Sequence, residues 1–400
     1  MSSTKNNIST TNTSPNVAQR QRILELINDH KFKYQELVVQ ILNNAIDKVH
    51  ITRKMSINAK NYIDLIIKAM TLSNSIKKIT LDSIHFTTAS AGDLESILKM
   101  NNIFSLKILN VSNINSRMWI YRLCSGLSKN TSLTKLTIRR CHILDKGCDC
   151  ILKALNGHQA IKTLNLIYCS MSDVCTNNLS LPVNLEYLDL SNNKIRSAPR
   201  IYSILNTITG HANLKTIILD DNELSTDAID QFCILLISNN SISDLYIQKN
   251  NLVYNDIVKI MDVVKYKEIK VLNIGYQYLD TNAVKYICDV LAEHKYITDI
   301  GLFNAGISSN DMKYIVENFI GKNLNIVVLG LCGNEIDDDC AEIIIDKLKN
   351  NDTLIYLTLP CCYISQSLLD IIIHRLVDNS RKYDLMSMSM TALLLADNNI

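Results

Sequence analysis

The 400-residue sequence has few of the residues that interrupt regular structure, with four prolines, 11 glycines and one tryptophan. It has no apolar run near the roughly 18 residues that a membrane-spanning helix needs. The longest runs resemble "FCILLI" at 232–237. The net charge of +2 gives no overall basic field of the kind that attracts nucleic acid nonspecifically. We therefore expect neither membrane insertion nor nucleic-acid binding.

Signals for export and for nucleotide binding are also missing. Residues 1–16, "MSSTKNNISTTNTSPN", are polar and lack the apolar core of a secretory signal. They predict a disordered tail and a cytoplasmic location, in the organism itself or in a host cell if the protein is an effector. The phosphate-binding pattern G-x-x-x-x-G-K-[ST] is matched only by "GKN" at 321–323, without its first glycine or its hydroxyl residue. We expect no cofactor.

The 12 cysteines do not suggest a disulfide framework, because they are spread along a long chain that has no export signal. One cluster, "CHILDKGCDC", brings Cys141, His142, Cys148 and Cys150 close together in sequence. It lacks the Cys-x-x-Cys spacing of a zinc site, so we expect buried free thiols and no metal. No histidine is placed to activate a strand cysteine, so we expect no catalytic residues and a protein that is not an enzyme.

A repeated phrase dominates the sequence. "LDLSNNKI" at 188–195 returns as "IILDDNEL" at 217–224 and as "LGLCGNEI" at 329–336. Each copy has apolar residues at relative positions 0, 3, 5 and 10, and a distinctive residue at position 8. The spacing clusters near 28 residues, which is the signature of a repeat array. The copies begin at Ile46, Ile76, Leu106, Leu133, Ile161, Leu185, Leu214, Ile242, Ile269, Ile297, Ile326, Leu354 and Met390.

Each copy predicts a strand, a turn and a helix. Positions 3 and 5 alternate as in a strand with one buried face, and stretches such as "STDAIDQFCILLISNN" follow with capping residues and a helical apolar period. The fifth unit is short and contains Pro182, so it predicts an extended segment or a single turn. Residues 17–45 predict a helical N-terminal cap, and residues 46–400 predict a domain of about 13 repeats.

The pattern L-x-x-L-x-L-x-x-N/C-x-L resembles the ribonuclease-inhibitor-like class of leucine-rich repeats. The resemblance implies an α/β leucine-rich-repeat solenoid, a horseshoe with a parallel β-sheet on its concave face and helices on its convex face. In this class the position-8 residue hydrogen-bonds neighbouring turns as a structural ladder. Lys54, Ile84, Ile114, Gln277 and Ala305 depart from that pattern. The expected ladder residues are Cys141, Cys169, Asn193, Asn222, Asn250, Asn334 and Cys362.

The resemblance leaves function open, because the class includes ribonuclease inhibitors, Ran GTPase-activating proteins, receptor sensors and microbial effectors. Function must therefore be sought at positions 2, 4, 6 and 7, which we expect on the concave face. Early units place the basic residues Lys135, Arg139 and Arg140 there. Middle units place an aromatic and acidic strip there, suited to a protein partner with basic residues. Its members are Tyr168, Tyr187, Asp189, Asp220, Asp221, Asp244, Tyr246, Tyr276, Asp299 and Phe303.

The sequence thus predicts a non-catalytic protein-interaction scaffold, with a microbial effector as one version. Two alternatives come from the resemblance. A GTPase-activating-type regulator resembling Ran GTPase-activating proteins would carry an acidic tail, whereas this chain ends in "ADNNI". A ribonuclease-inhibitor-like enzyme inhibitor would be strongly acidic, whereas the net charge is +2. The partner and the oligomeric state stay open.

Overall fold

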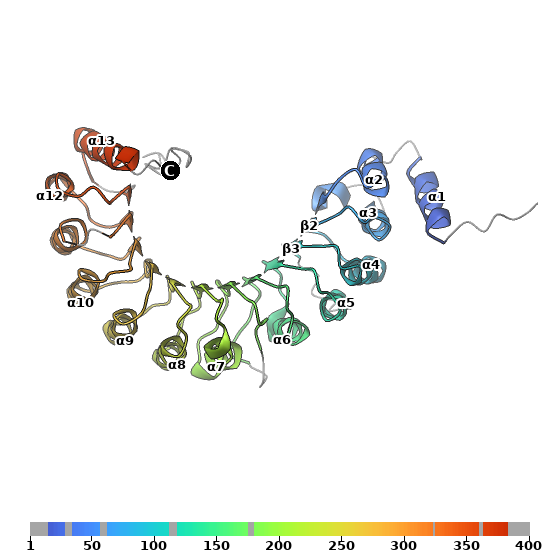
Figure 1. Cartoon of the computed structure of the whole chain (residues 1–400), viewed down its shortest axis with the longest axis horizontal. Helices are drawn as coiled ribbons and strands as arrows, with labels where there is room; N and C mark the ends of the chain where they lie inside the picture. The colour runs from blue at the N-terminus through green and yellow to red at the C-terminus, as the bar shows by residue number, and fades with distance from the viewer. Residues whose placement is uncertain are drawn as a thin grey trace, which may run out of the picture. The chain divides into compact units, whose positions relative to one another are not determined.

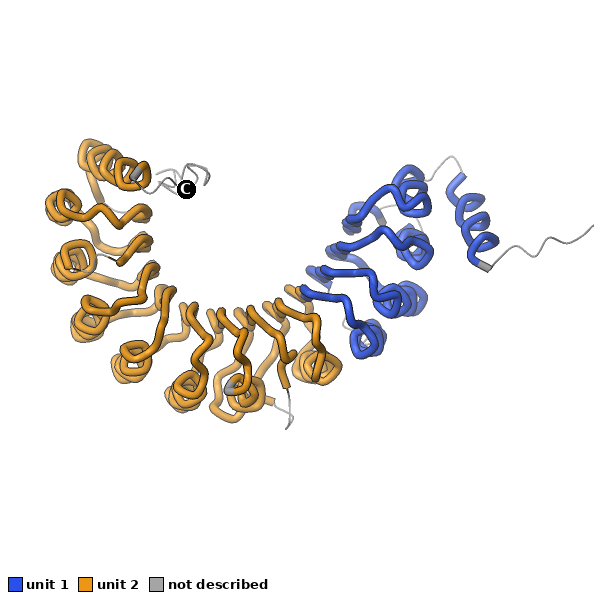
Figure 2. Tube along the Cα trace, in the orientation of Figure 1, with its two compact units in different colours: residues 1–136 blue, residues 137–400 orange. Residues whose placement is uncertain are grey.

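The computed structural model describes residues 15–28, 34–56, 62–111, 118–174, 180–322, 325–359 and 363–382. The chain divides into two compact units, residues 1–136 and residues 137–400, which are coloured separately in Figure 2. The boundary lies inside strand β4, Lys135–Arg139. None of the described helices is long and apolar enough to cross a membrane.

Unit 1 begins with two helices in the stretch predicted to be helical, and continues as repeats. Its strands β1, β2 and β3 pair in parallel, with Val49 opposite Ile79 and Ile79 opposite Leu106. These residues are buried because they face the helices. The elements are α1 (Pro15–Ile27), α2 (Gln35–Leu42), β1 (Lys48–Thr52), the 3-10 helix η1 (Arg53–Ser56), α3 (Tyr62–Met70), β2 (Lys78–Asp82), α4 (Thr88–Lys99), β3 (Ser105–Leu109) and α5 (Met118–Leu127).

The predicted start of the third copy at Leu106 is wrong by three residues. In the sheet, Leu106 pairs with Ile79 and Ile108 pairs with Leu81, so both occupy inward strand positions. The phrase therefore begins at Ile103, which is also buried. The error arose because the chain from Ile103 to Val111 offers apolar residues at both registers, and only strand pairing distinguishes them.

Unit 2 continues the same alternation. Strands β5 to β12 pair in parallel, each with the next in sequence. The elements are α6 (Leu144–Ala154), β5 (Thr163–Ile167), β6 (Tyr187–Asp189), α7 (Ala198–Leu205), η2 (Ile208–Gly210), β7 (Thr216–Ile218), α8 (Thr226–Ile237), β8 (Asp244–Tyr246), α9 (Tyr254–Val264), β9 (Val271–Asn273), α10 (Thr281–Leu291), β10 (Asp299–Gly301), α11 (Ser309–Ile315), the π-helical turn η3 (Val316–Ile320), β11 (Val328–Gly330), α12 (Asp338–Leu348), β12 (Tyr356–Thr358) and α13 (Gln366–Lys382).

Within unit 2 the helices cover one face of the sheet and leave the other face open (Figure 1). The core lies between the two layers, where one apolar residue per strand forms a continuous buried row in register. A single strand and helix cannot bury their apolar faces alone. Each repeat buries them by stacking on the repeats before and after it. The structure confirms the predicted α/β solenoid. The row runs through Leu188, Ile217, Leu245, Leu272, Ile300, Leu329 and Leu357.

Helix starts follow the predicted capping residues. The side chains of Ser225, Asp280, Ser308 and Asp337 each accept a hydrogen bond from the backbone N–H three residues later. Each cap stands at position 11 of its copy. These bonds satisfy N–H groups that have no partner inside the helix, so these four helices begin at the same position of the repeat.

Asparagines at position 8 join the turns of unit 2. Asn250 is fully buried; its Oδ1 accepts from the Asn222 N–H at 3.0 Å, and its Nδ2 donates to the carbonyls of Leu219 and Ile247 at 3.0 Å each. Asn193, Asn222 and Asn334 make equivalent bonds. The thiols of Cys141 and Cys169 donate to backbone carbonyls in the same row, and Cys362 lies outside the described residues.

Gln277, counted from sequence as a departure, acts in the same way as the asparagines. Its Oε1 accepts from the N–H groups of Asn250 and Leu252 at 3.2 and 2.9 Å, and its Nε2 donates to Ile247 and Ile274. A longer amide therefore fits the same site. The residue type alone did not reveal this, because glutamine is uncommon at that position of the pattern.

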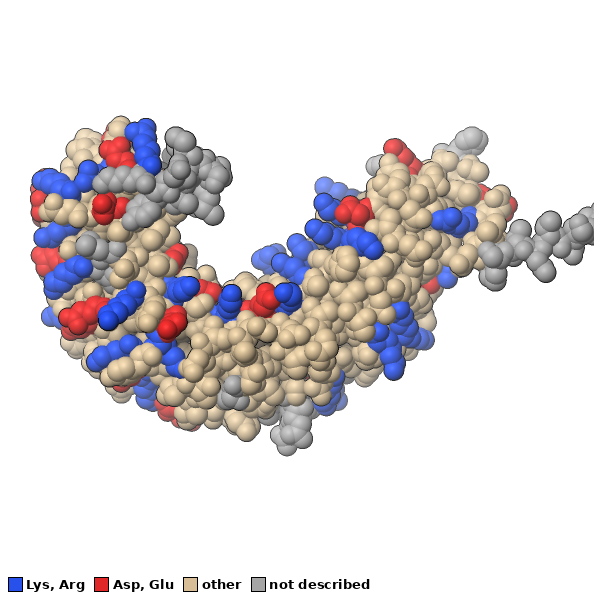
Figure 3. Space-filling view, viewed as in Figure 1, with Lys and Arg blue, Asp and Glu red and all other residues tan. Residues whose placement is uncertain are grey.

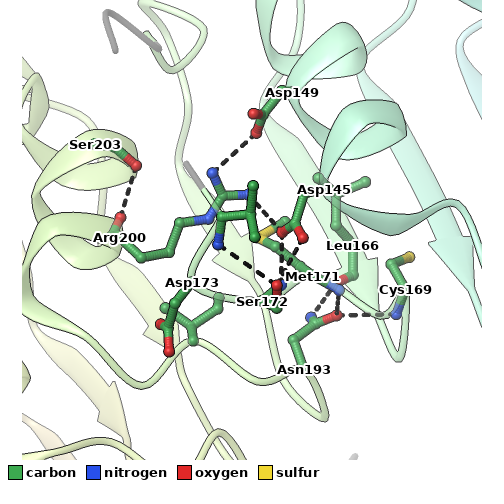
Figure 4. A network of polar contacts seen from close by, with 12 residues as sticks. Asp145, Asp149, Leu166, Cys169, Met171, Ser172, Asp173, Asn193, Arg200 and Ser203 are labelled. Atoms are coloured by element: carbon green, nitrogen blue, oxygen red, sulfur yellow. Dashed lines mark hydrogen bonds and ion pairs between the residues drawn. The ribbon is translucent and has the colours of Figure 1, made fainter. Parts of the chain in front are cut away.

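The fifth unit has no helix in its described part, and a buried ion pair fills the resulting gap. Arg200 of α7 is fully buried, and its guanidinium donates to Asp149 of α6 at 3.0 Å and faces Asp145 at 3.6 Å (Figure 4). Asp145 in turn accepts from the N–H and hydroxyl of Ser172 at 2.6 Å each. The Arg200 side chain thus links α7 to α6, although the two bonded residues are 51 positions apart in the sequence.

Candidate partner-binding surface

The ten residues of the predicted strip divide between strands and turns of unit 2. Tyr187 and Asp189 lie on β6, Asp244 and Tyr246 on β8, and Asp299 on β10. All five stand at outward positions, because they alternate with the buried core row. The other five stand at positions 6 and 7, just beyond the strand ends: Tyr168, Asp220, Asp221, Tyr276 and Phe303.

The two strand tyrosines are half-buried and surrounded by carboxylates. Burial, followed by the charges of Asp189, Tyr246 and Asp220, raises the pKa of Tyr187 to about 12. Burial, followed by Asp244, Asp299 and Asp220, also raises the pKa of Tyr246. Both hydroxyls are therefore protonated at neutral pH and available as hydrogen-bond donors.

Asp189 and Asp220 are the most enclosed carboxylates of the strip. Asp189 is 7% exposed and accepts from the N–H and hydroxyl of Ser191 at 2.9 and 2.6 Å, and burial raises its pKa. Asp220 accepts from the N–H and side-chain amide of Gln248 at 2.8 and 3.0 Å. Burial raises the pKa of Asp220 to about 6, and repulsion from Asp189 and Asp221 adds to this. Burial therefore disfavours the ionised form of both carboxylates, and a cationic group of a partner would stabilise that form.

The remaining carboxylates are oriented by hydroxyls. Asp244 accepts from Thr216 at 3.0 Å, and Asp299 accepts from Thr298 at 2.5 Å. Burial raises the pKa of Asp299, and the charge of Asp244 adds to the effect. Among the described residues no lysine or arginine lies within ion-pair distance of Asp189, Asp220, Asp244 or Asp299. Asp221 differs, since it pairs with Lys249 at 2.8 Å.

Tyr168 and Tyr276 occupy an unfavourable backbone conformation. Their φ angles are 52° and 55°, and their side chains are 57% and 48% exposed. Bulky residues rarely adopt this left-handed conformation, which suits glycine and asparagine. Position 7 is left-handed in every described turn from the second to the eleventh copy, at Ser83, Asn110, Arg140, Tyr168, Asn192, Asp221, Lys249, Tyr276, Asn304 and Gly333.

The repeat, not the tyrosine, therefore sets this conformation. At eight of these ten turns the position-7 N–H donates to a carbonyl of the next repeat, as Tyr168 does to Ser191 at 3.0 Å. Asparagine or glycine would meet this requirement with less strain. Among the described residues neither tyrosine hydroxyl makes a hydrogen bond within the chain, and both rings contribute exposed aromatic surface.

Phe303 closes the strip at its C-terminal side. Its ring lies against β11, where a Cβ atom added to Gly330 would stand 2.2 Å from the ring. A Cβ at Gly275 would meet the Phe303 backbone at 2.7 Å. Gly330 thus makes room for the Phe303 ring, and Gly275, which follows β9, lets the Phe303 backbone approach closely.

A groove of about 450 Å³ lies beside the strip, along the turns that follow β4 to β7. It includes the predicted residues Tyr168 and Asp221. Its other side chains stand at positions 7, 8 and 9 of their copies; Asn193 was predicted only as a ladder residue, and none was predicted to bind a partner. These are His142, Ser170, Asn192, Asn193, Lys194 and Glu223.

The cysteine cluster forms part of the core. Cys141, Cys148 and Cys169 are fully buried, and a hydrogen bond with Cys148, followed by burial, raises the pKa of the Cys169 thiol well above its usual value. His142 instead bonds the Ser170 hydroxyl at 2.5 Å on the surface. Within the described ranges no group of three or more His, Cys, Asp or Glu side chains is arranged to hold a metal ion.

Comparison with known proteins gives distant similarities, and no family model matches the chain. The human NACHT, LRR and PYD domains-containing protein 13 is 24% identical over 295 residues, which are 72% of this chain and 23% of the human protein. The chain thus spans about a quarter of the length of that relative. An internalin structure from Listeria monocytogenes overlaps 90% of this chain and 92% of its own at 15% identity, with a TM-score of 0.43. The structure of a TLR13–ssRNA13 complex overlaps 74% of this chain and 37% of that one at 12% identity, with a TM-score of 0.40.

The repeat supplies the family assignment, and the human relative agrees with it. Parallel strands alternate with capped helices at about 28 residues, and position-8 amides join the turns. A human protein named for its leucine-rich repeats aligns with 72% of the chain. This chain is a leucine-rich repeat protein.

Proposed function

We propose that the protein is a non-catalytic interaction scaffold, and that unit 2 binds a protein partner on the open face of its sheet. The binding surface is the strip of Tyr168, Tyr187, Tyr246 and Tyr276 with the carboxylates between them. The partner presents lysine or arginine side chains to the carboxylates and apolar atoms to the rings. Membership of the ribonuclease-inhibitor-like class is part of this proposal.

The observation that carries the proposal is the exposed, left-handed pair Tyr168 and Tyr276. Tyrosine in this conformation costs stability, so its presence twice in unit 2 favours a role outside folding. Tyrosine is also common where a few residues dominate binding energy. The four carboxylates that have no ion-pair partner among the described residues add a preference for a basic partner.

The experiment uses the full chain as bait, in cytosol of the source organism and of any host. Wild type is compared with a Tyr187→Ala, Tyr246→Ala, Tyr276→Ala variant, and each retained protein is purified and its Kd measured. We expect at least one purified partner to bind wild type and to lose at least about tenfold in affinity with the variant, as truncation of hot-spot residues does.

The matched control is a Tyr121→Ala, Tyr202→Ala, Tyr266→Ala variant, which removes three tyrosines that are 60%, 53% and 81% exposed outside the strip. Circular dichroism establishes that both variants are folded. Equal loss of binding in the two variants, or retention of binding by the strip variant, would remove the strip as the binding surface.

A further inference from the structure

The open face of the unit 1 sheet carries a lysine on each of its strands. Lys48, Lys78 and Lys107 are exposed on β1, β2 and β3. Lys135 is also exposed, and its N–H donates to Phe104 beside β3 at 3.0 Å. We call these four residues the lysine strip. Figure 3 shows Lys and Arg side chains gathered along this side of unit 1.

Strand pairing brings these charges close together. Lys48 stands directly opposite Lys78, and Thr80 stands opposite Lys107. Neighbouring strands are about 4.8 Å apart, so the ammonium groups repel one another unless an anion lies between them. The corrected register of the third copy is essential here, because the sequence register assigned Lys107 to no outward position.

The described part of the chain does not neutralise this charge. No carboxylate lies within ion-pair distance of the lysine strip among the described residues. Asp82 is the one carboxylate at the outward positions of β1 to β3, and it accepts from Ser83 and Asn110 at 2.9 and 2.7 Å. Asp47, which directly precedes β1, is exposed. The strip therefore keeps most of its positive potential.

We propose that the lysine strip is a second docking surface, and that it binds an acidic segment of a protein partner. Carboxylates of an extended segment can lie across the strands and meet successive lysines. Thr80 and Ser105, which line the same face, supply hydroxyls for its backbone. The proposal is independent of the Tyr and Asp strip of unit 2.

The composition of the face distinguishes this partner from nucleic acid. Proteins that bind single strands stack bases on aromatic side chains, and the outward positions of β1, β2 and β3 contain no Phe, Tyr or Trp. Lysine also acts as a point charge without the bidentate geometry that arginine offers to phosphate. Carboxylates, which are met by single charges and hydroxyls, fit the face better.

The test measures binding of a short labelled poly-glutamate peptide to the full chain by fluorescence anisotropy. A Lys48→Glu, Lys78→Glu, Lys107→Glu variant should bind at least about tenfold more weakly than wild type, from the summed effect of three exposed charges. Added salt should weaken wild-type binding, because exposed charges are screened. If charge reversal disturbs folding, a Lys48→Gln, Lys78→Gln, Lys107→Gln variant, which removes the same charges without reversing them, replaces the glutamate variant in the binding measurement.

A control variant, Lys129→Glu, Lys146→Glu, Lys153→Glu, makes the same charge change at exposed positions outside the strip. It should bind the peptide as wild type does. Parallel arms use a poly-uridine oligonucleotide and vesicles of phosphatidylserine with phosphatidylcholine. The proposal is overturned if wild type does not bind the peptide, if the control loses binding equally, or if RNA or vesicles bind the strip more tightly than the peptide.

Discussion

The open faces of the two units have the same backbone and opposite chemistry. In unit 1 the outward positions of β1 to β3 hold lysines, a histidine and hydroxyl residues, with Asp82 as their one carboxylate and Leu109 as their one apolar residue. In unit 2 those of β6, β8 and β10 hold tyrosines and aspartates. The inward positions are apolar in both. Packing thus restricts only the inward positions of each strand. The outward positions can carry a different ligand surface in each unit.

The units also differ in how their turns are held. Position 8 is occupied by Ile84 in unit 1 and by amides such as Asn250 in unit 2. Strands β1 to β3 have five residues each, whereas among the described strands of unit 2 only β5 has five and β6 to β12 have three each. Unit 1 therefore relies more on strand pairing and apolar contacts, and unit 2 relies on buried polar groups.

The largest expected difference between the units concerns their helix-linking arginines. Arg200→Ala in unit 2 should lower the free energy of unfolding by about 3–5 kcal/mol, because it removes the guanidinium that pairs with the buried Asp149 carboxylate. Arg122→Ala in unit 1 should cost at most about 1 kcal/mol, because that side chain is 46% exposed beside Glu95. Urea unfolding of both variants measures this, and similar losses would contradict the contrast.

A second prediction exchanges the residues of the turns. Asn250→Leu should destabilise unit 2 by about 2–3 kcal/mol, because buried N–H and C=O groups of two repeats lose their partner. The reverse change, Ile84→Asn, should also destabilise, because it buries an amide in an apolar site. Thermal unfolding followed by circular dichroism provides the comparison. A stable Ile84→Asn variant would show that unit 1 can accept the amide ladder.

A third prediction uses pH to separate the two faces. Asp220 takes up a proton near its raised pKa of about 6, so binding of a basic partner by unit 2 should weaken severalfold from pH 7 to pH 5. Because the folded pKa lies above the unfolded value of 3.8, its contribution to stability is fully present below about pH 4 and is lost as pH rises through about 6. Asp220→Asn should reduce both dependences, measured by calorimetry and thermal unfolding, and leave the part that comes from Asp189 and Asp299. Poly-glutamate binding by unit 1 should not share the Asp220 dependence.

The smallest expected effect concerns the left-handed turns. Tyr276→Gly should raise stability by about 0.5–1 kcal/mol, because glycine adopts the φ of 55° without strain. The same change should weaken partner binding. Tyr278→Gly, at an exposed residue without positive φ, should bring no gain in thermal stability. Unit 1 already has Ser83 and Asn110 at its left-handed positions, so it offers no comparable gain.

Particular residues show where prediction from sequence succeeded and where it failed. Leu188 and Leu245 were assigned correctly to the core because their period of repetition is long and regular. Leu106 was misplaced because one register of an apolar segment resembles the next, and the pairing with Ile79 decides between them. Gln277 was counted as a departure because of its residue type, whereas its role in the ladder depends on the contact of its amide with the Asn250 N–H.

Other features gave no periodic signal. Asn239 Oδ1 accepts from the N–H groups of Ser241 and Ile242, and His294 Nδ1 accepts from that of Ile297 at 3.1 Å. These side chains link the end of a helix to the next strand. Because asparagine and histidine both make this bond, neither residue type recurs often enough to reveal the position in the sequence.

The sequence by itself determined the repeat, its strand–turn–helix content, the capped helix starts and most of the inward residues, because these depend on local spacing. The tertiary structure decided what spacing cannot express. It placed Lys48 opposite Lys78, set Tyr168 and Tyr276 in left-handed turns, and joined Arg200 to Asp149 across the short fifth unit. Such relations depend on the stacking of one repeat on another, and stacking brings together residues that the linear pattern keeps about 28 or more positions apart.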